Sequence, residues 1–208
     1  MKEEKDYIQD IAEIRSMMER SSKFLSLSGW AGIMAGIYAL SGAYVAFKYL
    51  NFNPDAIIYS PVNTGSLFSD FSMTILLAII ILTMAIGTAI FLSGRKAGKR
   101  GEKLWNSTSK RLLINMAVPL VAGGLLILAL INQGFIGLIA PFSLIFYGLA
   151  LYNAGKFTYD GVKILGLIQI GLGLLGSWFT EYGLLCWAAG FGLIHIIYGI
   201  YIHYKYEK

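Results

Sequence analysis

Apolar and polar positions follow each other in long blocks along this chain, without the short alternation typical of a soluble fold. Six blocks are almost wholly apolar, and each has about 18 to 24 residues, enough to cross the hydrocarbon core of a bilayer as a helix. They predict membrane spans at about 24–47, 71–93, 110–131, 134–152, 162–179 and 182–203. The predicted fold class is all-α: a polytopic membrane protein with six transmembrane helices.

The connections between these blocks predict how the helices pair. Residues 132–134 (Asn-Gln-Gly) and 180–183 (Thr-Glu-Tyr-Gly) are turns of only a few residues, so each joins two antiparallel helices. The first two spans are joined by a long irregular segment, 51–70, rich in Pro, Asn and Ser. The six spans are therefore expected to form three hairpins.

Composition agrees with a membrane domain. The chain is 56% hydrophobic and only 14% charged, whereas soluble domains carry about 25% charged residues. In a soluble domain the net charge of +5 would suggest nucleic acid. Here the cations lie in loops beside apolar blocks, so anionic lipid headgroups are the expected partner and nucleic acid is not.

The densest group of cations lies between the second and third spans, in the stretch from Ser93 to Arg111. This basic stretch holds one acid, Glu102, and the cations Arg95, Lys96, Lys99, Arg100, Lys103, Lys110 and Arg111. Such loops stay on the cytoplasmic side of a membrane. The six-span arrangement also places sixteen of the 17 Lys and Arg residues on that side, with Lys48 on the other. Both termini are therefore predicted to be cytoplasmic.

An amphipathic helix is predicted before the first span, in residues 1–23, where Tyr7, Ile11, Ile14 and Met18 recur at helical spacing. Three placements compete: in the headgroup region, in a short coiled coil, or docked on the protein's own cytoplasmic face. The segment is net acidic, unlike most interfacial helices, and too short for a typical coiled coil, so docking is favoured. The chain then reads as this helix, a membrane domain at 24–203, and a cytoplasmic tail at 204–208.

No acid or base lies deep in any predicted span, which disfavours a proton- or ion-coupled pump. The remaining polar residues are neutral or nearly so: Asn115, Ser143, Gln169 and His195. Pro119 is expected to free the Asn115 carbonyl, and Pro141 the Gly137 carbonyl. These groups could line a ligand-binding pocket, or each could simply bond to a neighbouring helix for modest stability. The structural role is favoured, and the pocket is the alternative.

Signals for an enzyme are weak. Ser143 lies in PFSLI and Ser41 in ALSGA, and neither has the Gly-x-Ser-Gly setting of an intramembrane serine protease. One cysteine, Cys186, excludes an intrachain disulfide and a cysteine-cluster metal site, and the two histidines, His195 and His203, are too few for a metal centre. We expect no catalytic residue, no metal and no cofactor.

An internal repeat of 49 residues is suggested by the third-to-fourth and fifth-to-sixth hairpins. At this offset Gly124 aligns with Gly173, and the turn glycine Gly134 with Gly183. Such parallel repeats occur in some transporters.

One segment carries a family resemblance. Glu13 to Tyr44, EIRSMMERSSKFLSLSGWAGIMAGIYALSGAY, resembles the start of a family of bacterial multi-pass membrane proteins without an assigned activity. The resemblance implies the bacterial cytoplasmic (inner) membrane and lends no catalytic residues.

The expected function is a non-enzymatic scaffold, sensor or regulatory role on the cytoplasmic face, with anionic lipid, a protein partner or a second copy bound there. The alternative is a carrier or channel for a small neutral solute. Arg95, Lys96, Lys99, Arg100 and Lys103 are the expected headgroup contacts. They are also the face on which the N-terminal acids Asp6, Asp10 and Glu13 are predicted to latch.

Overall fold

The computed structural model describes residues 23–24, 26–50, 52, 67–99, 101 and 105–207, with the backbone alone at 67–71. This part of the chain is helical, and six of its helices are long and apolar enough to cross a membrane, which confirms the predicted number. The first five run through α2 (Gly29–Lys48), α4 (Leu67–Lys99), α5 (Ser107–Gln133), α6 (Ile139–Ala154) and α7 (Gly161–Trp178). The sixth, Thr180–Tyr206, is composite: η2 (Thr180–Tyr182), α8 (Gly183–Trp187), the π-helical η3 (Ala188–Ile194) and α9 (His195–Tyr206).

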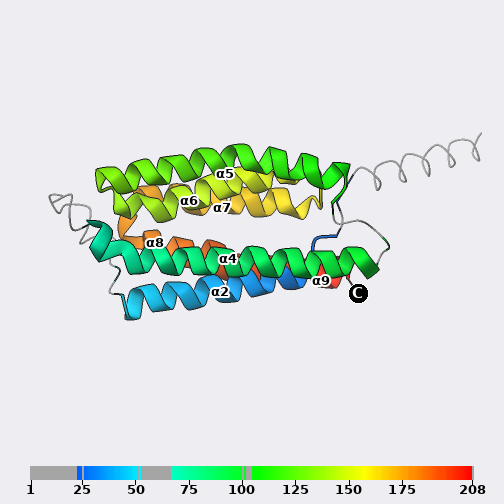
Figure 1. Ribbon diagram of the computed structural model, residues 1–208, viewed down its shortest axis with the longest axis horizontal. Helices are drawn as coiled ribbons and strands as arrows, with labels where there is room; N and C mark the ends of the chain where they lie inside the picture. The colour runs from blue at the N-terminus through cyan, green and yellow to red at the C-terminus, as the bar shows by residue number, and fades with distance from the viewer. Residues whose placement is uncertain are drawn as a thin grey trace, which may run out of the picture.

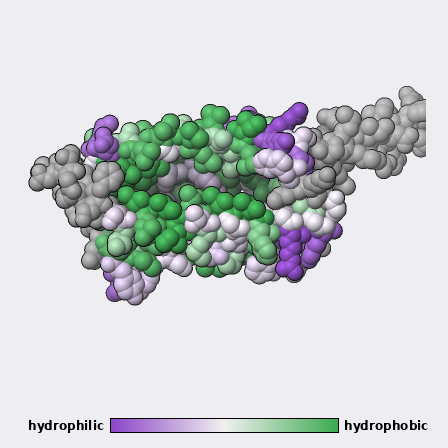
Figure 2. Space-filling view, in the orientation of Figure 1, coloured by the Kyte–Doolittle hydropathy of each residue, from purple (hydrophilic) through white to green (hydrophobic). Residues whose placement is uncertain are grey.

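The helices lie side by side along the long axis of the molecule (Figure 1). α6 packs on both α5 and α7, the sixth helix packs on α6, α7 and α2, and α2 packs on α4. α4 and α5 are therefore the outer helices, and the other four are the inner ones. On the face in Figure 2 the middle is mainly apolar, and the hydrophilic residues gather toward the two ends.

Two inner pairs approach closely because glycines face each other's backbone. A Cβ atom on Gly148 of α6 would lie 2.6 Å from the Gly166 carbonyl of α7, and one on Gly199 of α9 would lie 2.5 Å from the Gly29 carbonyl of α2. Small residues allow such backbone contact where lipid supplies no hydrophobic drive. Gly32 and Gly36 of α2 likewise lie against the sixth helix.

The basic stretch is shared between two helices and the connection between them. α4 continues to Lys99, past the predicted end of the span, and Gly101 then adopts a left-handed φ of 67°. Asn106 starts α5 with a capping box: its side chain accepts from the Ser109 N–H, and the Ser109 hydroxyl accepts from the Asn106 N–H. Because these signals end one helix and begin the next, the cations described here are divided between two helices, with Arg95, Lys96 and Lys99 on α4 and Lys110 and Arg111 on α5.

The predicted 49-residue repeat does not match the build of the two turns. Gly134 caps α5 with a left-handed φ of 79°, whereas Gly183 has an ordinary helical φ of −55°. Both turns pass through a short 3-10 helix, η1 (Ile136–Leu138) and η2, but η2 begins 44 residues after η1. A Cβ atom on Gly173 would lie 2.8 Å from the Pro141 carbonyl, whereas one on Gly124 would meet open space. The aligned glycines thus have different roles.

Candidate functional site

Two polar clusters are built between helices, one inside the bundle and one at its end. The first centres on the Gly190 carbonyl in the π-helical turn η3. A π-helical turn is wider than an α-helical one and is frequent at functional sites. The Gly190 carbonyl accepts one hydrogen bond from the Gln169 amide nitrogen and one from the His195 ring, both at 2.8 Å. We call Gln169, Gly190, His195 and Tyr147 the buried cluster.

The hydrogen bonds assign the tautomer of His195. A carbonyl can only accept, so the Nδ1 atom that faces Gly190 must carry the hydrogen. In the neutral ring Nε2 is then the acceptor, and the Tyr147 hydroxyl donates to it at 3.0 Å. The 3.3 Å separation between Gln169 Nε2 and His195 Nδ1 joins two donors and adds no hydrogen bond. Both ring nitrogens of His195 are therefore engaged within the protein.

Gln169 is fully buried, and both its amide nitrogen and its amide oxygen face Gly190. Its amide oxygen lacks a hydrogen-bond partner among the described residues. A Cβ atom on Gly190 would lie 2.5 Å from that oxygen, so the hydrogen in its place points at it as a weak C–H donor. Gln169 thus contacts Gly190 through both amide atoms. The two residues are packed directly against each other.

Only two of the four predicted pocket residues come together. Gln169 and His195 meet, but Asn115 donates to the Arg111 carbonyl at 2.8 Å and Ser143 donates to the Ala140 carbonyl at 2.7 Å. Both of these acceptors lie one turn back on the same helix. Asn115 and Ser143 thus bond within their own helices, as short polar side chains can, and the alternative of one four-residue pocket stays a prediction.

Of the two prolines, Pro119 lies as expected and Pro141 does not. Pro119 lies inside α5 and is buried, where the missing N–H leaves the Asn115 carbonyl without its usual donor. Pro141 lies in the first turn of α6, where an N–H has no intrahelical partner in any case. It therefore frees no carbonyl in mid-span.

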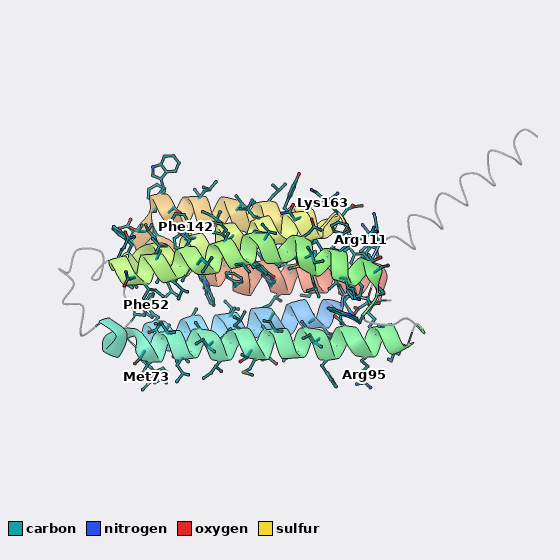
Figure 3. The ribbon with its side chains drawn as sticks, turned by 45° about the horizontal axis from the view of Figure 1, so that its top comes forward. Phe52, Met73, Arg95, Arg111, Phe142 and Lys163 are labelled. Atoms are coloured by element: carbon teal, nitrogen blue, oxygen red, sulfur yellow. The ribbon has the colours of Figure 1, made fainter. Side chains whose placement is uncertain are left out.

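The second cluster lies at the end of the bundle where Arg95, Arg111 and Lys163 gather, opposite the end that carries Phe52, Met73 and Phe142 (Figure 3). We call this the basic end. Its centre is the carboxylate of Glu207, directly after α9, which is 12% exposed. One oxygen accepts from the Gly29 N–H at 2.9 Å and from the Lys96 ammonium at 3.0 Å, and the other contacts His203 at 2.7 Å.

Glu207 acts as a distant cap for α2. The residue at the N-cap position, Ser28, makes no side-chain capping bond, and the glutamate supplies the missing acceptor from 178 residues away. A carboxylate is also favoured beside the positive end of the helix dipole. Lys96, 13% exposed, donates in addition to the Leu27 carbonyl at 2.6 Å. We call Lys96, Glu207, His203, Leu27 and Gly29 the capping cluster.

These contacts fix the charge of Glu207. Burial raises the pKa of the carboxyl, but the hydrogen bonds from His203, from the Gly29 N–H and from Lys96 outweigh it and lower the pKa from 4.5 to about 2. Glu207 is therefore ionised throughout the physiological range.

The predicted headgroup contacts divide into two kinds. Arg95 and Lys99 are exposed, as expected. Lys96 is turned inward to the capping cluster, so it is not one of the exposed contacts. Five of the predicted residues lie outside the described part of the chain: the cations Arg100 and Lys103, and the N-terminal acids Asp6, Asp10 and Glu13.

Other polar contacts fasten the start of the described chain to the same end. The Phe24 N–H donates to the Phe157 carbonyl at 2.7 Å, and the Phe24 carbonyl accepts from the Thr158 hydroxyl at 2.8 Å. Lys23 approaches Asp160 at 3.8 Å. The segment before the first span therefore joins the bundle at the loop between α6 and α7.

Glu207 and Tyr147 were not singled out by sequence reasoning. The spacing of four between His203 and Glu207 is a visible helical pair, but Gly29 and Lys96 are brought to Glu207 only by the fold. Tyr147 reads as one aromatic among many in an apolar helix.

The clusters offer no obvious reactive set. Within the described ranges, no three His, Cys, Asp or Glu side chains gather as a metal site would require. Cys186 is a free thiol. What the arrangement can do chemically is fix helices to one another and present charge at one end.

The fold fits a multi-pass membrane protein. No protein-family model, curated protein or solved structure matches the chain.

Proposed function

We propose that this chain is a non-enzymatic scaffold or regulatory protein of the bacterial cytoplasmic membrane that engages anionic lipid headgroups through its basic end. The observation that carries the proposal is the contrast between the clusters and the surface. The polar groups of the buried cluster and the capping cluster largely bond to one another, whereas Arg95, Lys99, Lys110 and Arg111 are exposed at the ends of α4 and α5.

The orientation in the membrane is part of the proposal. The basic end carries the described loops rich in Lys and Arg, together with Phe24 and Glu207, so the positive-inside rule favours a cytoplasmic location for this end and for both termini. The six helices then form three hairpins. In a Cys186→Ser background, membrane-impermeant thiol reagents on intact cells should label Glu181→Cys and spare Lys156→Cys. The reverse pattern would contradict the orientation.

Anionic lipid is favoured over a protein partner because the exposed charge follows the expected headgroup plane. Each Lys or Arg near an anionic surface contributes about 1 kcal/mol, or about fivefold in affinity. The acids described at this end are already paired, Glu207 with Lys96 and Asp160 with Lys23 and Lys163. The exposed cations are therefore left for an anionic partner outside the bundle.

Lipid selectivity tests the proposal directly. Native mass spectrometry of the purified protein should show several-fold preferential retention of phosphatidylglycerol over phosphatidylcholine. Arg95→Glu with Lys99→Glu should abolish the preference, whereas Lys48→Glu at the opposite end should leave it unchanged. Equal retention of the two lipids by the wild type would contradict the proposal.

The carrier hypothesis has less support. Gln169 and His195 are engaged with Gly190 and Tyr147, and Asn115 and Ser143 with their own helices. It remains a prediction that a small neutral solute raises the thermal stability of the wild type but not of Gln169→Leu. Stabilisation of both proteins would count against a site at Gln169.

A further inference from the structure

α4 is attached to the bundle along one narrow seam. It packs chiefly on α2, where Ile81 lies against Gly42 and the Thr88 hydroxyl lies 3.3 Å from the Tyr38 hydroxyl. Lys96 continues the seam at the basic end. These three α4 positions are seven and eight residues apart, so they share one face of the helix.

Outside the seam, tight packing of α4 is confined to the basic end, where Ser93 and Ala97 are buried. None of its most apolar 18-residue window is buried inside the protein, compared with 28–39% of the corresponding windows in the inner helices. Gly87 faces open space. The position of α4 therefore depends on the seam, and at the basic end on the contacts of Lys96 together with the burial of Ser93 and Ala97.

Lys96 connects three helices through one ammonium group. It donates to the Leu27 carbonyl just before α2 and to the Glu207 carboxylate just after α9. It also lies over the Tyr159 ring, 5.7 Å from the ring centre. The Lys96 side chain is only 13% exposed. It therefore fills the space between α4 and the ends of α2 and α9.

The geometry lets Lys96 exchange its partner without leaving Glu207 unpaired. If Lys96 left, Glu207 would keep the Gly29 N–H and His203 as partners, so the carboxylate would not be left unpaired. A phosphate group offers Lys96 several oxygen acceptors with the same charge-assisted character. Arg95 and Lys99, exposed beside it on α4, would draw such a group to this end.

We propose that Lys96 is a latch that holds the basic end of α4 against the bundle, and that an anionic phospholipid headgroup releases it by replacing Glu207 as its partner. The inference rests on the proposed function, since it makes α4 the element that responds to anionic lipid. Change of pH is a poor trigger, because Glu207 stays charged well below neutrality.

Distances between spin labels on α4 and α9 test the latch. Labels at Phe91 and Tyr204, both exposed, are introduced into the full chain with Cys186→Ser and measured by double electron–electron resonance in nanodiscs. In phosphatidylcholine the wild type should give one distance population, and Lys96→Met should add a longer one. Lys96→Arg should behave as the wild type. Lys205→Met is the matched control, because Lys205 is an exposed cation at the same end that bonds to Tyr201.

Adding phosphatidylglycerol should shift the wild type toward the population seen in Lys96→Met. An unchanged distance in folded Lys96→Met would overturn the latch. If phosphatidylglycerol is retained in native mass spectrometry but leaves the wild-type distance unchanged, headgroup release is overturned and the proposed function survives. If the lipid is neither retained nor effective, both fail. Should Lys96→Met not fold, Lys96→Gln keeps a donor for Leu27 without the charge and replaces it under the same criteria.

Discussion

The inner helices and the outer helices use several of their glycines in opposite ways. In the inner pairs, Gly148, Gly166 and Gly199 lie against the backbone of another helix, whereas Gly87 of α4 and Gly124 of α5 face open space. The two outer helices are also the most apolar of the six and the least buried. In a bilayer, apolar character thus marks the surface offered to lipid, and close backbone contact marks the interior.

The largest expected effect comes from filling an inner glycine. Gly166→Val would place a Cβ atom 2.7 Å from both the Gly148 carbonyl and the Tyr152 nitrogen, and backbone cannot move aside as a flexible side chain can. Overpacking of this kind should lower the free energy of unfolding by about 3 kcal/mol or more. Thermal unfolding in detergent, followed by size-exclusion chromatography, measures the loss.

The matched control adds the same side chain on an outer helix. A Cβ atom at Gly87 or Gly124 meets nothing within 4 Å. For Gly87→Val and Gly124→Val the free energy of unfolding should therefore change by no more than the difference in helix propensity, about 0.5 kcal/mol. Equal losses in the inner and outer variants would show that the division into inner and outer helices is wrong.

A second prediction concerns the capping cluster, where an outer helix is joined to two inner ones. Glu207→Gln removes a largely buried charge that Lys96 and the start of α2 share, and should cost about 2 kcal/mol at neutral pH. Because folding lowers the pKa of Glu207, its contribution is present above the unfolded value of 4.5 and is lost as pH falls toward about 2. The difference in unfolding midpoint between wild type and variant should therefore shrink across this window. A difference that stays constant from pH 7 to the acid end would contradict the role of the charge.

The smallest effects separate polar residues inside the bundle from those on an outer helix. Gln169→Leu leaves the Gly190 carbonyl with one donor fewer and should cost about 1 kcal/mol. Asn115→Leu on α5 removes a bond to its own helix and should change stability by less than about 0.5 kcal/mol. Thermal unfolding of both variants in one detergent checks the order. A larger loss for Asn115→Leu would show that the outer position has an unrecognised partner.

The sequence predicts where the helices lie in the chain better than it predicts which helices pack against one another. Block length and loop charge place six helices, because these depend on local composition. The meeting of Lys96 with Glu207, or of Gln169 with Gly190, depends on which helix faces which, and the apolar blocks carry little information on that. The π-helical turn has no local signature beyond Gly190 and Gly192, so the site could be predicted only as a set of isolated polar residues.

The distance in sequence between Gly29 and its cap has a consequence for biosynthesis. At about 5 to 20 residues per second, the ribosome adds Glu207 roughly 10 to 35 s after Gly29. Through that interval α2 enters the membrane with its first N–H unsatisfied by the carboxylate, and Lys96 on α4 has no counter-charge there. The nascent bundle thus keeps an open basic end until α9 arrives.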